Sequence, residues 1–174
     1  MPPLRALPLL ILMGLLLVAA PACERSAPPP KTAVGIGQPA PDFLLRDLEG
    51  NSWSLTDLRG NLVFLNFWAT WCPPCREEMP SMEALRQELA GRSFRMVTVL
   101  GNDEPANAQR FLARIGAAMP VLLDPDGSTT LAYGITGVPE TFIIDSQGIL
   151  RERFIGGRDW NSSSAKAMLA RYLP

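Results

Sequence analysis

Residues 62–75 read Leu-Val-Phe-Leu-Asn-Phe-Trp-Ala-Thr-Trp-Cys-Pro-Pro-Cys, and the predicted fold is built around this segment. Residues 62–69 form a near-continuous apolar run, which is typical of a strand covered on both faces of a sheet. From Cys75 onward, apolar residues recur at helical spacing and stop before Gly91; they are Met79, Met82, Leu85 and Leu89. The sequence therefore predicts a buried strand that runs into an amphipathic helix, with a Cys-x-x-Cys pair at the junction.

Further strands and helices are expected around this junction. Two hairpins are predicted from paired apolar stretches with glycine in the turn, 42–46 with 52–55 and 141–145 with 149–154. Buried strands are expected at 94–100 and 121–124, and helices at 105–115, 128–133 and 162–172. The order β-β-β-α-β-α-β-α-β-β-α predicts an α/β domain with a central mixed β-sheet flanked by helices.

Composition excludes several classes of protein. The chain has 174 residues, enough for one domain, and 16 Lys and Arg against 17 Asp and Glu, which argues against a nucleic-acid partner. It contains no histidine, which excludes Ser-His-Asp and Cys-His catalysis, histidine-ligated metal sites and a c-type haem attachment motif. Three cysteines are too few for a disulfide-stapled scaffold. We therefore expect no metal and no bound cofactor.

Residues 1–22 have the pattern of a signal peptide or membrane anchor. Arg5 is followed by an uncharged, largely aliphatic run that ends in small residues just before Cys23. Three alternatives remain open, namely a cleaved soluble form, an uncleaved anchor, and a lipoprotein in which Cys23 is the lipidated N-terminal residue. All three predict an extracytoplasmic domain, because Arg5 holds the N-terminus inside.

A proline-rich linker is expected to follow at residues 23–36. Pro28-Pro29-Pro30 lies in its middle, and such a composition favours a stiff, extended spacer. The folded domain is therefore predicted to span residues 37–174, held away from a membrane surface by the linker.

The pair Cys72 and Cys75 has the spacing of a redox-active dithiol. At the first turn of a helix, unpaired backbone N–H groups and the helix dipole stabilise a thiolate. We therefore expect the Cys72 sulfur to be exposed and to ionise below the free-cysteine value of about 8.5. Cys75, one turn further in, would be the less exposed, resolving thiol. Local sequence alone also allows a structural disulfide or half of a metal site, and by default one of Trp68 and Trp71 would be a core residue.

The residues around this pair resemble the thioredoxin superfamily. Residues 67–76, with Pro80 beyond them, are similar to its active-site segment. Gly37-Gln38-Pro39-Ala40-Pro41-Asp42-Phe43, residues 120–127 and residues 133–145 resemble the membrane-tethered TlpA/ResA-like thiol–disulfide oxidoreductases. The resemblance covers residues 37–174. It implies a thioredoxin-like fold with an N-terminal β-hairpin extension, and an enzyme whose redox centre is a Cys72–Cys75 disulfide.

The resemblance also implies roles for other residues near the pair. Pro139 matches a cis-proline that faces the two cysteines, although only about 5–6 % of X–Pro bonds in folded proteins are cis. A cis bond would place the Val138 backbone beside Cys72, where it could pair with an extended substrate strand. Trp71, Pro73 and Pro74 are the remaining candidates for substrate contacts.

Glu78 matches an acid that family members carry three residues after the second cysteine. It could take the proton of Cys75 and so promote resolution, or be a solvated helix glutamate like Glu77 and Glu83. Thioredoxins place a buried acid at the position of Asn66, and asparagine cannot shuttle a proton. Either Glu78 or water must then deprotonate Cys75.

The dipeptide Pro73-Pro74 predicts a reductant. It lacks the histidine of strongly oxidising relatives, and two prolines remove two amide donors from the turn. The expected partners are protein disulfides and a membrane dithiol that supplies electrons in an oxidising compartment. Apocytochrome c is a candidate client, because relatives in cytochrome c maturation share a stretch like Pro139–Phe142.

Four other functions can be compared with the sequence. The domain could be a general periplasmic reductase or isomerase partner with other clients, or a catalytically idle binding module. Copper delivery through a thiol pair is disfavoured by the lack of histidine and of a methionine beside the cysteines. A peroxidase is disfavoured because Ala69, three residues before Cys72, stands where a threonine would be needed.

Overall fold

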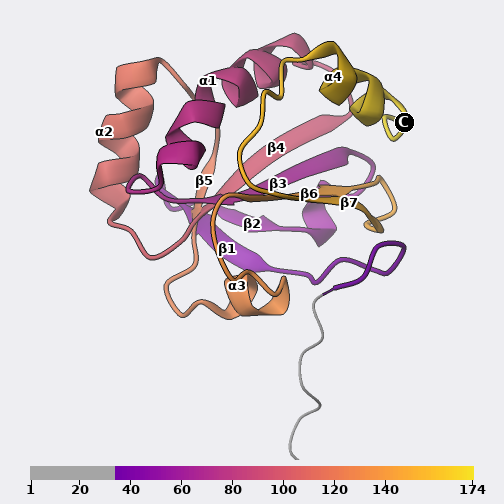
Figure 1. Ribbon diagram of the computed structural model, residues 1–174. Helices are drawn as coiled ribbons and strands as arrows, with labels where there is room; N and C mark the ends of the chain where they lie inside the picture. The colour runs from indigo at the N-terminus through magenta and orange to yellow at the C-terminus, as the bar shows by residue number, and fades with distance from the viewer. Residues whose placement is uncertain (1–33) are drawn as a thin grey trace, which may run out of the picture.

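In the computed structural model, residues 34–174 are described, and they build one seven-stranded sheet with helices on both faces (Figure 1). The strands are β1 (Leu44–Asp47), β2 (Ser52–Ser54), β3 (Leu62–Trp68), β4 (Phe94–Leu100), β5 (Val121–Leu123), β6 (Glu140–Ile144) and β7 (Leu150–Ile155). The helices are α1 (Pro73–Glu88), α2 (Pro105–Ile115), α3 (Ser128–Ala132) and α4 (Ser163–Ala170), with a 3-10 turn at Thr56–Leu58. The α/β class and the order of elements expected from the sequence are confirmed.

The sheet is mixed, with strand order β2-β1-β5-β4-β3-β6-β7. Strands β3, β4 and β5 are parallel, whereas β6 and β7 on one side and β1 and β2 on the other add antiparallel pairs. The predicted N-terminal hairpin is the β1–β2 pair, and β1 joins it to the sheet by pairing with β5. Strand β3 lies between β4 and β6, so every residue of β3 is buried.

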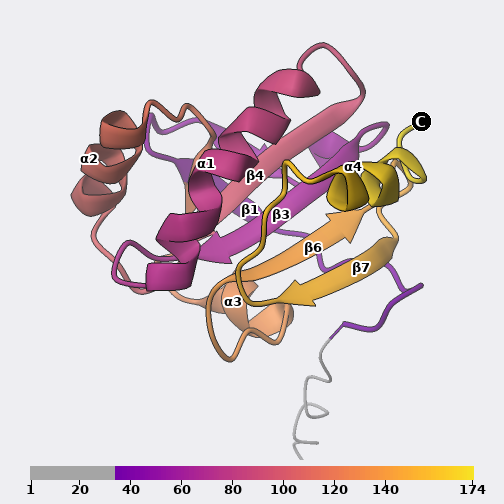
Figure 2. The ribbon, with the colours of Figure 1, turned by 45° about the horizontal axis from the view of Figure 1, so that its top comes forward.

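Two apolar clusters fill the space above and below the sheet. Helices α1, α2 and α4 cover one face, and α3 with the 3-10 turn lies on the other (Figure 2). Successive side chains of a strand point to opposite faces. In β3, Phe64 and Trp68 therefore pack under α1, whereas Leu65 and Phe67 pack on the α3 side. By the same alternation Asn66 is a polar residue on the α1 face of an apolar strand.

The predictions for the N-terminal region concern residues that lie mostly outside the described range. The signal peptide or anchor at 1–22, the lipidation candidate Cys23 and most of the linker 23–36 lie there. Within the described part, Val34 already packs against the cluster on the α3 side. None of the helices in residues 34–174 has the length and apolar character needed to cross a membrane.

Candidate active site

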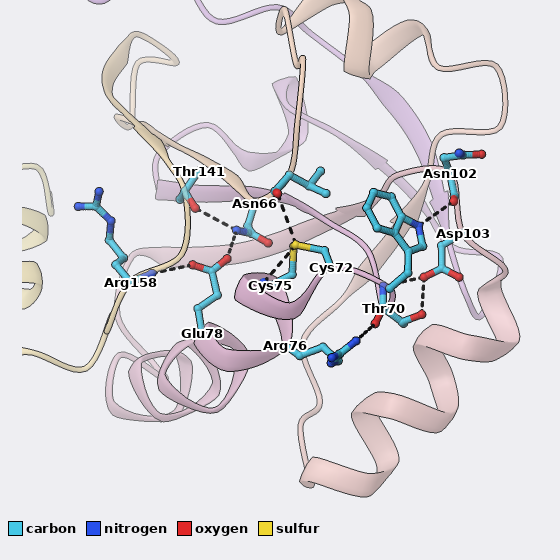
Figure 3. The surroundings of a disulfide bond; sticks show 12 residues. Asn66, Thr70, Cys72, Cys75, Arg76, Glu78, Asn102, Asp103, Thr141 and Arg158 are labelled. Carbon is cyan, nitrogen blue, oxygen red and sulfur yellow. Dashed lines mark hydrogen bonds between the residues drawn. A yellow bond between two sulfur atoms is a disulfide. The ribbon is translucent and has the colours of Figure 1, made fainter.

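Cys72 and Cys75 form a disulfide at the beginning of α1 (Figure 3). Cys72 is the residue that caps the helix, and its sulfur accepts a hydrogen bond from the backbone N–H of Cys75 at 3.3 Å. Pro73 and Pro74 occupy the first two helical positions and have no N–H to offer. The Cys75 amide is therefore the first helix donor that the Cys72 sulfur can meet.

The expectation of an exposed Cys72 sulfur is wrong for this disulfide form. Cys72 is only 3 % exposed, and Cys75 is fully buried. The Cys72 sulfur is bonded to the buried Cys75, and the carbonyl oxygen of Val138 lies 3.4 Å from it. The prediction that Cys75 is less exposed than Cys72 is confirmed, but the loop before β6 shields Cys72 from solvent.

That loop contains a cis peptide bond between Val138 and Pro139. The bond isomer expected from the resemblance is thus observed, and it places the Val138 carbonyl beside Cys72 as expected. Pro139 is buried, and its own carbonyl accepts a hydrogen bond from Gly156 N at 2.9 Å. The loops before β6 and after β7 are therefore tied together next to the disulfide.

The two tryptophans before the cysteines have different environments. Trp68 is fully buried in β3 and donates a hydrogen bond to the Thr98 hydroxyl at 3.1 Å. Trp71 is 59 % exposed, and its indole N–H donates to the carbonyl oxygen of Asn102 at 3.1 Å. The default expectation that one of them is a core residue is met by Trp68, and Trp71 presents an oriented aromatic surface beside Cys72.

Asp103, in the loop between β4 and α2, holds the segment that leads into Cys72. Its carboxylate accepts hydrogen bonds from Thr70 N at 2.6 Å and from the Thr70 hydroxyl, and also from Asn107. Partial burial opposes its ionisation, but these hydrogen bonds outweigh that effect and keep the pKa of Asp103 below its ordinary value. From the other side, Arg76 donates to the carbonyl oxygen of Thr70 at 2.8 Å.

Glu78 lies one turn after Cys75 and is buried, with 2 % of its surface exposed. Its Oε1 accepts from Asn66 Nδ2 at 3.0 Å, and its Oε2 accepts from Trp160 Nε1 at 3.0 Å and from Arg158 N at 3.3 Å. Burial raises the pKa of the Glu78 carboxyl above its ordinary value, although these hydrogen bonds and the Arg158 charge oppose the rise. The solvated-glutamate alternative for Glu78 is therefore wrong.

Glu83, which served as an example of a solvated glutamate, is also buried. It pairs with Arg86 and accepts a hydrogen bond from Gln87. The hydrogen bonds from Arg86 outweigh desolvation and lower the pKa of Glu83. Glu77, in contrast, is exposed as expected.

Asn66, at the position of the thioredoxin acid, is fully buried on β3 beneath α1. Its Nδ2 donates to Glu78 and also to the Thr141 hydroxyl at 2.9 Å. Its Oδ1 has no hydrogen-bond partner. A neutral amide thus joins β3, β6 and α1 where thioredoxins carry an ionisable group.

The loop between β7 and α4 closes over the start of α1. Gly157 approaches so closely that a Cβ there would lie 2.8 Å from the Pro74 carbonyl oxygen. The Arg158 guanidinium lies 3.9 Å from the centre of the Phe154 ring, and the buried Trp160 ring packs edge-on against the same ring. Between this loop and α1 runs a groove of about 390 Å³, lined by Pro74, Glu77, Glu78, Pro80, Ser81, Gly157, Arg158 and Asp159.

Sequence reasoning did not single out Asp103, Thr141, Arg158 or Trp160. All four lie far from residues 72–75 in sequence and reach the site only through the sheet and the loops at its end. In the sequence, a tryptophan that closely follows the two glycines at 156–157 could have marked Trp160 as a residue of a tight loop. Among residues 34–174, no three Cys, Asp or Glu side chains come together in a way that could hold a metal ion.

The chain is similar in sequence to a known protein family and to characterised relatives. Residues 36–153 match the model of the AhpC/TSA family. The thiol-disulfide oxidoreductase ResA of Geobacillus thermodenitrificans is 41 % identical over 126 residues, which cover 72 % of each chain. The thioredoxin-like protein YneN of Bacillus subtilis is 39 % identical over 130 residues, 72 % of this chain and 76 % of that one.

Two solved structures are similar to this chain in fold. A thiol:disulfide interchange protein of the thioredoxin family from Chlorobium tepidum superimposes with a TM-score of 0.68 at 32 % identity, covering 79 % of this chain and 99 % of that one. The exposed lipoprotein thioredoxin Etrx1 of Streptococcus pneumoniae gives a TM-score of 0.63 at 27 % identity, covering 75 % and 99 %. Fold, disulfide and relatives agree, and the chain belongs to the AhpC/TSA family as a ResA-like thiol–disulfide oxidoreductase of the thioredoxin superfamily.

Proposed function

We propose that this oxidoreductase works as an extracytoplasmic protein disulfide reductase, with Cys72 and Cys75 as its catalytic pair. The observation that carries the proposal is the disulfide at the N-terminus of α1, which faces the cis-proline loop at Val138–Pro139. A purely structural disulfide would need neither the Val138 carbonyl beside its outer sulfur nor a buried carboxyl behind it.

In the reduced enzyme, the Cys72 thiolate attacks one sulfur of a client disulfide. The client's S–S bond breaks, its other sulfur leaves as a thiolate that takes up a proton, and Cys72 becomes joined to the client. Cys75, as a thiolate, then attacks Cys72, which reforms the Cys72–Cys75 disulfide and releases the second client thiol. Two electrons pass from the enzyme to the client.

Glu78 takes the proton that Cys75 must lose before this second attack. Cys75 and Glu78 are three residues apart on α1, so they share the face that lies against β3. A carboxyl whose pKa is raised by burial is better matched to a thiol proton than an ordinary glutamate. Asn66 cannot replace it, because an amide does not titrate.

Val138 and the exposed residues around Cys72 form the client-binding surface of this proposal, with the buried Pro139 behind them. The Val138 backbone would pair with an extended client segment. Trp71, Pro73 and Pro74 are all exposed and border the sulfur, so they would contact side chains next to the client cysteine.

The reducing direction follows from the donors available to the Cys72 thiolate. Because Pro73 and Pro74 lack N–H groups, only the Cys75 amide donates to this sulfur from the first helical turn. Weak stabilisation of the thiolate disfavours the reduced form, which lowers the reduction potential. A membrane dithiol would then return electrons to the disulfide.

The extracytoplasmic location rests on residues 1–23. Lipidation of Cys23 is the form of tether that we favour, and the similarity to an exposed lipoprotein thioredoxin supports it. Radiolabelled palmitate should enter the wild-type chain and not Cys23→Ala. Label retained by Cys23→Ala, or a wild-type chain that takes up none, would contradict this part of the proposal.

Apocytochrome c is the client that we propose, with its Cys-x-x-Cys-His pair as the disulfide. The Cys75→Ala variant should stop after the first attack and accumulate a mixed disulfide on Cys72 that mass spectrometry identifies. Cys72→Ala is the matched control, because it removes the attacking sulfur and should trap nothing. Both variants lack the intramolecular disulfide, so differences between them report on attack.

Two outcomes would redirect the proposal. A trapped client other than an apocytochrome would support a general reductase instead. Recovery of no covalent partner, together with no reduction of insulin by the wild type, would contradict the reductase reading itself.

A further inference from the structure

Asn66 Oδ1 is the buried side-chain oxygen or nitrogen that lacks a hydrogen-bond partner in residues 34–174. Every neighbouring polar group at the site is paired, since Glu78 accepts three hydrogen bonds and the Thr141 hydroxyl accepts one. Leaving a buried acceptor empty is unfavourable, so its persistence beside a redox centre points to a partner that exists in another state of the enzyme.

The orientation of the amide follows from its other atom. Glu78 and Thr141 fix the Asn66 nitrogen, so the oxygen must point away from both. Figure 3 draws the nitrogen of Asn66 toward Glu78 and its oxygen on the side of the disulfide. Cys75 is fully buried on the same face of α1 as Glu78, one turn closer to the helix N-terminus.

We propose that Asn66 Oδ1 accepts the hydrogen bond of the Cys75 thiol when the disulfide is reduced. The inference rests on the proposed dithiol chemistry and adds a positioning residue to it. An external dithiol gives two electrons and two protons and becomes a disulfide, and the Cys72–Cys75 bond breaks. One of the two protons stays on Cys75, the other is released to solvent, and Cys72 is left as a thiolate. While the disulfide is closed, Cys75 has no S–H group to donate, so Asn66 Oδ1 is empty only in the oxidised state.

This hydrogen bond decides which sulfur keeps the proton. The amide oxygen favours a neutral thiol at Cys75 and disfavours a thiolate there, whereas the Cys75 N–H favours negative charge on Cys72. Among the charged groups, the Glu78 carboxyl lies one turn beyond Cys75 on the same face of α1, and it accepts a hydrogen bond from the Arg158 backbone N–H, while the Arg158 guanidinium lies over the Phe154 ring. Asn66 therefore favours the reduced form in which Cys72 is the nucleophilic thiolate and Cys75 is a neutral thiol.

The test is the equilibrium of the purified enzyme with a dithiothreitol redox buffer at fixed pH. Asn66→Leu removes the acceptor and leaves an apolar side chain of similar size. We expect the equilibrium to shift about tenfold toward the disulfide, which is about 30 mV toward lower potential for two electrons. Thr98→Val is the matched control, because it removes a buried hydroxyl from the neighbouring strand β4 that bonds to Trp68 and Pro120 and not to Asn66, and it should leave the potential unchanged.

A second experiment separates a direct effect on Cys75 from an effect through Glu78. In a Glu78→Gln background, adding Asn66→Leu should give the same shift. Loss of the shift in that background would show that Asn66 acts only through Glu78 and would overturn the inference.

A spectroscopic measurement needs no Asn66 variant and covers the case in which Asn66→Leu does not fold. In the reduced wild type, the infrared S–H stretch that disappears in Cys75→Ser should lie at the lower frequency of a hydrogen-bonded thiol. A band at the frequency of a free thiol would overturn the inference. None of these measurements uses a client protein, so they stand apart from the test of the reductase proposal.

Discussion

Nε1 of Trp160 lies 3.0 Å from Oε2 of Glu78, although the two residues are 82 positions apart in the chain. Trp160 is fully buried, packed edge-on between Phe64 of β3 and Phe154 of β7. The indole therefore cannot swing away without opening the core. It fixes one oxygen of the carboxyl while Asn66 fixes the other, so the Glu78 side chain is held in one position on the face of α1 that carries Cys75.

Glu78→Gln should slow the release of client from the mixed disulfide. Glutamine cannot accept the Cys75 proton, and general-base assistance is worth about 10²-fold or more in rate. Single-turnover release of a reduced peptide from the Cys72 adduct measures this step directly. The exposed neighbour provides the control, since Glu77→Gln makes the same change of charge and should release peptide at the wild-type rate. Equal rates in both variants would assign the proton to water.

The stability that Glu78 contributes should depend on pH in a defined direction. Burial raises the pKa of Glu78 in the folded protein, so the folded state binds this proton more tightly than the unfolded chain. Its contribution is then fully present below the unfolded value, near 4.5, and is lost as the pH rises through the folded pKa. Urea unfolding should show the stability of the wild type falling, relative to Glu78→Gln, as pH rises across this range. An opposite slope would mean that hydrogen bonding, not burial, dominates at this carboxyl.

Gly157→Ala should disturb the active-site turn. The added Cβ would lie 2.8 Å from the Pro74 carbonyl oxygen and 3.3 Å from its Cβ, so backbone has to move. Overpacking of this kind costs about 1–3 kcal/mol, and we expect slower insulin reduction as well as lower stability. A Cβ at Gly137 would meet nothing within 4 Å, so Gly137→Ala is the matched control. Wild-type activity in Gly157→Ala would show that the loop after β7 does not restrain Pro74.

Asp103→Asn should loosen the segment before Cys72. The amide that replaces one carboxylate oxygen would present N–H groups to donors, and we expect a loss of about 1–3 kcal/mol in unfolding free energy. Because hydrogen bonds keep the Asp103 pKa low, the wild-type advantage should be complete above the ordinary aspartate value and vanish as pH falls through the folded pKa. Chemical denaturation at several pH values tests both points. Glu104→Gln, on an exposed neighbour, should change stability by less than about 0.5 kcal/mol.

Pro74→Ala should raise the reduction potential. Alanine returns a backbone N–H to the second helical position, where it can stabilise the Cys72 thiolate and so the reduced form. A tenfold change in the redox equilibrium corresponds to about 30 mV, and we expect a rise of up to that size. Pro80→Ala makes the same substitution further along α1 and should leave the potential unchanged. A potential that stays the same in Pro74→Ala would show that the missing amide does not set the direction of the reaction.

Local patterns were sufficient for the elements of the fold. The apolar run at 62–69 and the helical spacing after Cys75 are properties of neighbouring residues, and they correspond to β3 and α1. For most of the other elements, the predicted and observed ends differ by one or two residues. The first and last residues of helices and strands are held by weak terminal contacts, so their exact positions are hard to predict. Strand order could not be obtained in this way, since pairing joins residues that are distant in sequence.

At the site, the sequence predicted the redox chemistry correctly but not the burial of individual side chains. The spacing of Cys72 and Cys75 indicated a disulfide-forming pair, and the resemblance indicated the cis bond at Pro139, both of which are observed. The prediction that Cys72 is exposed was wrong because its exposure depends on Val138, which lies 66 positions away in the sequence. The solvation of Glu83 was wrong for a similar reason, since the Ala118 amide that bonds to its carboxylate comes from beyond α2.

The identity and spacing of nearby residues reveal the succession of strands and helices along the chain and the redox pair, and the composition reveals the absence of histidine. The three-dimensional fold was needed to show that Glu78 is a buried carboxyl held by Trp160, Arg158 and Asn66, and that Asn66 keeps one oxygen unpaired. Desolvation and hydrogen bonding depend on what surrounds a group in space, and the partners of Glu78 come from β3 and from the loop after β7, which are both distant from Glu78 in the sequence.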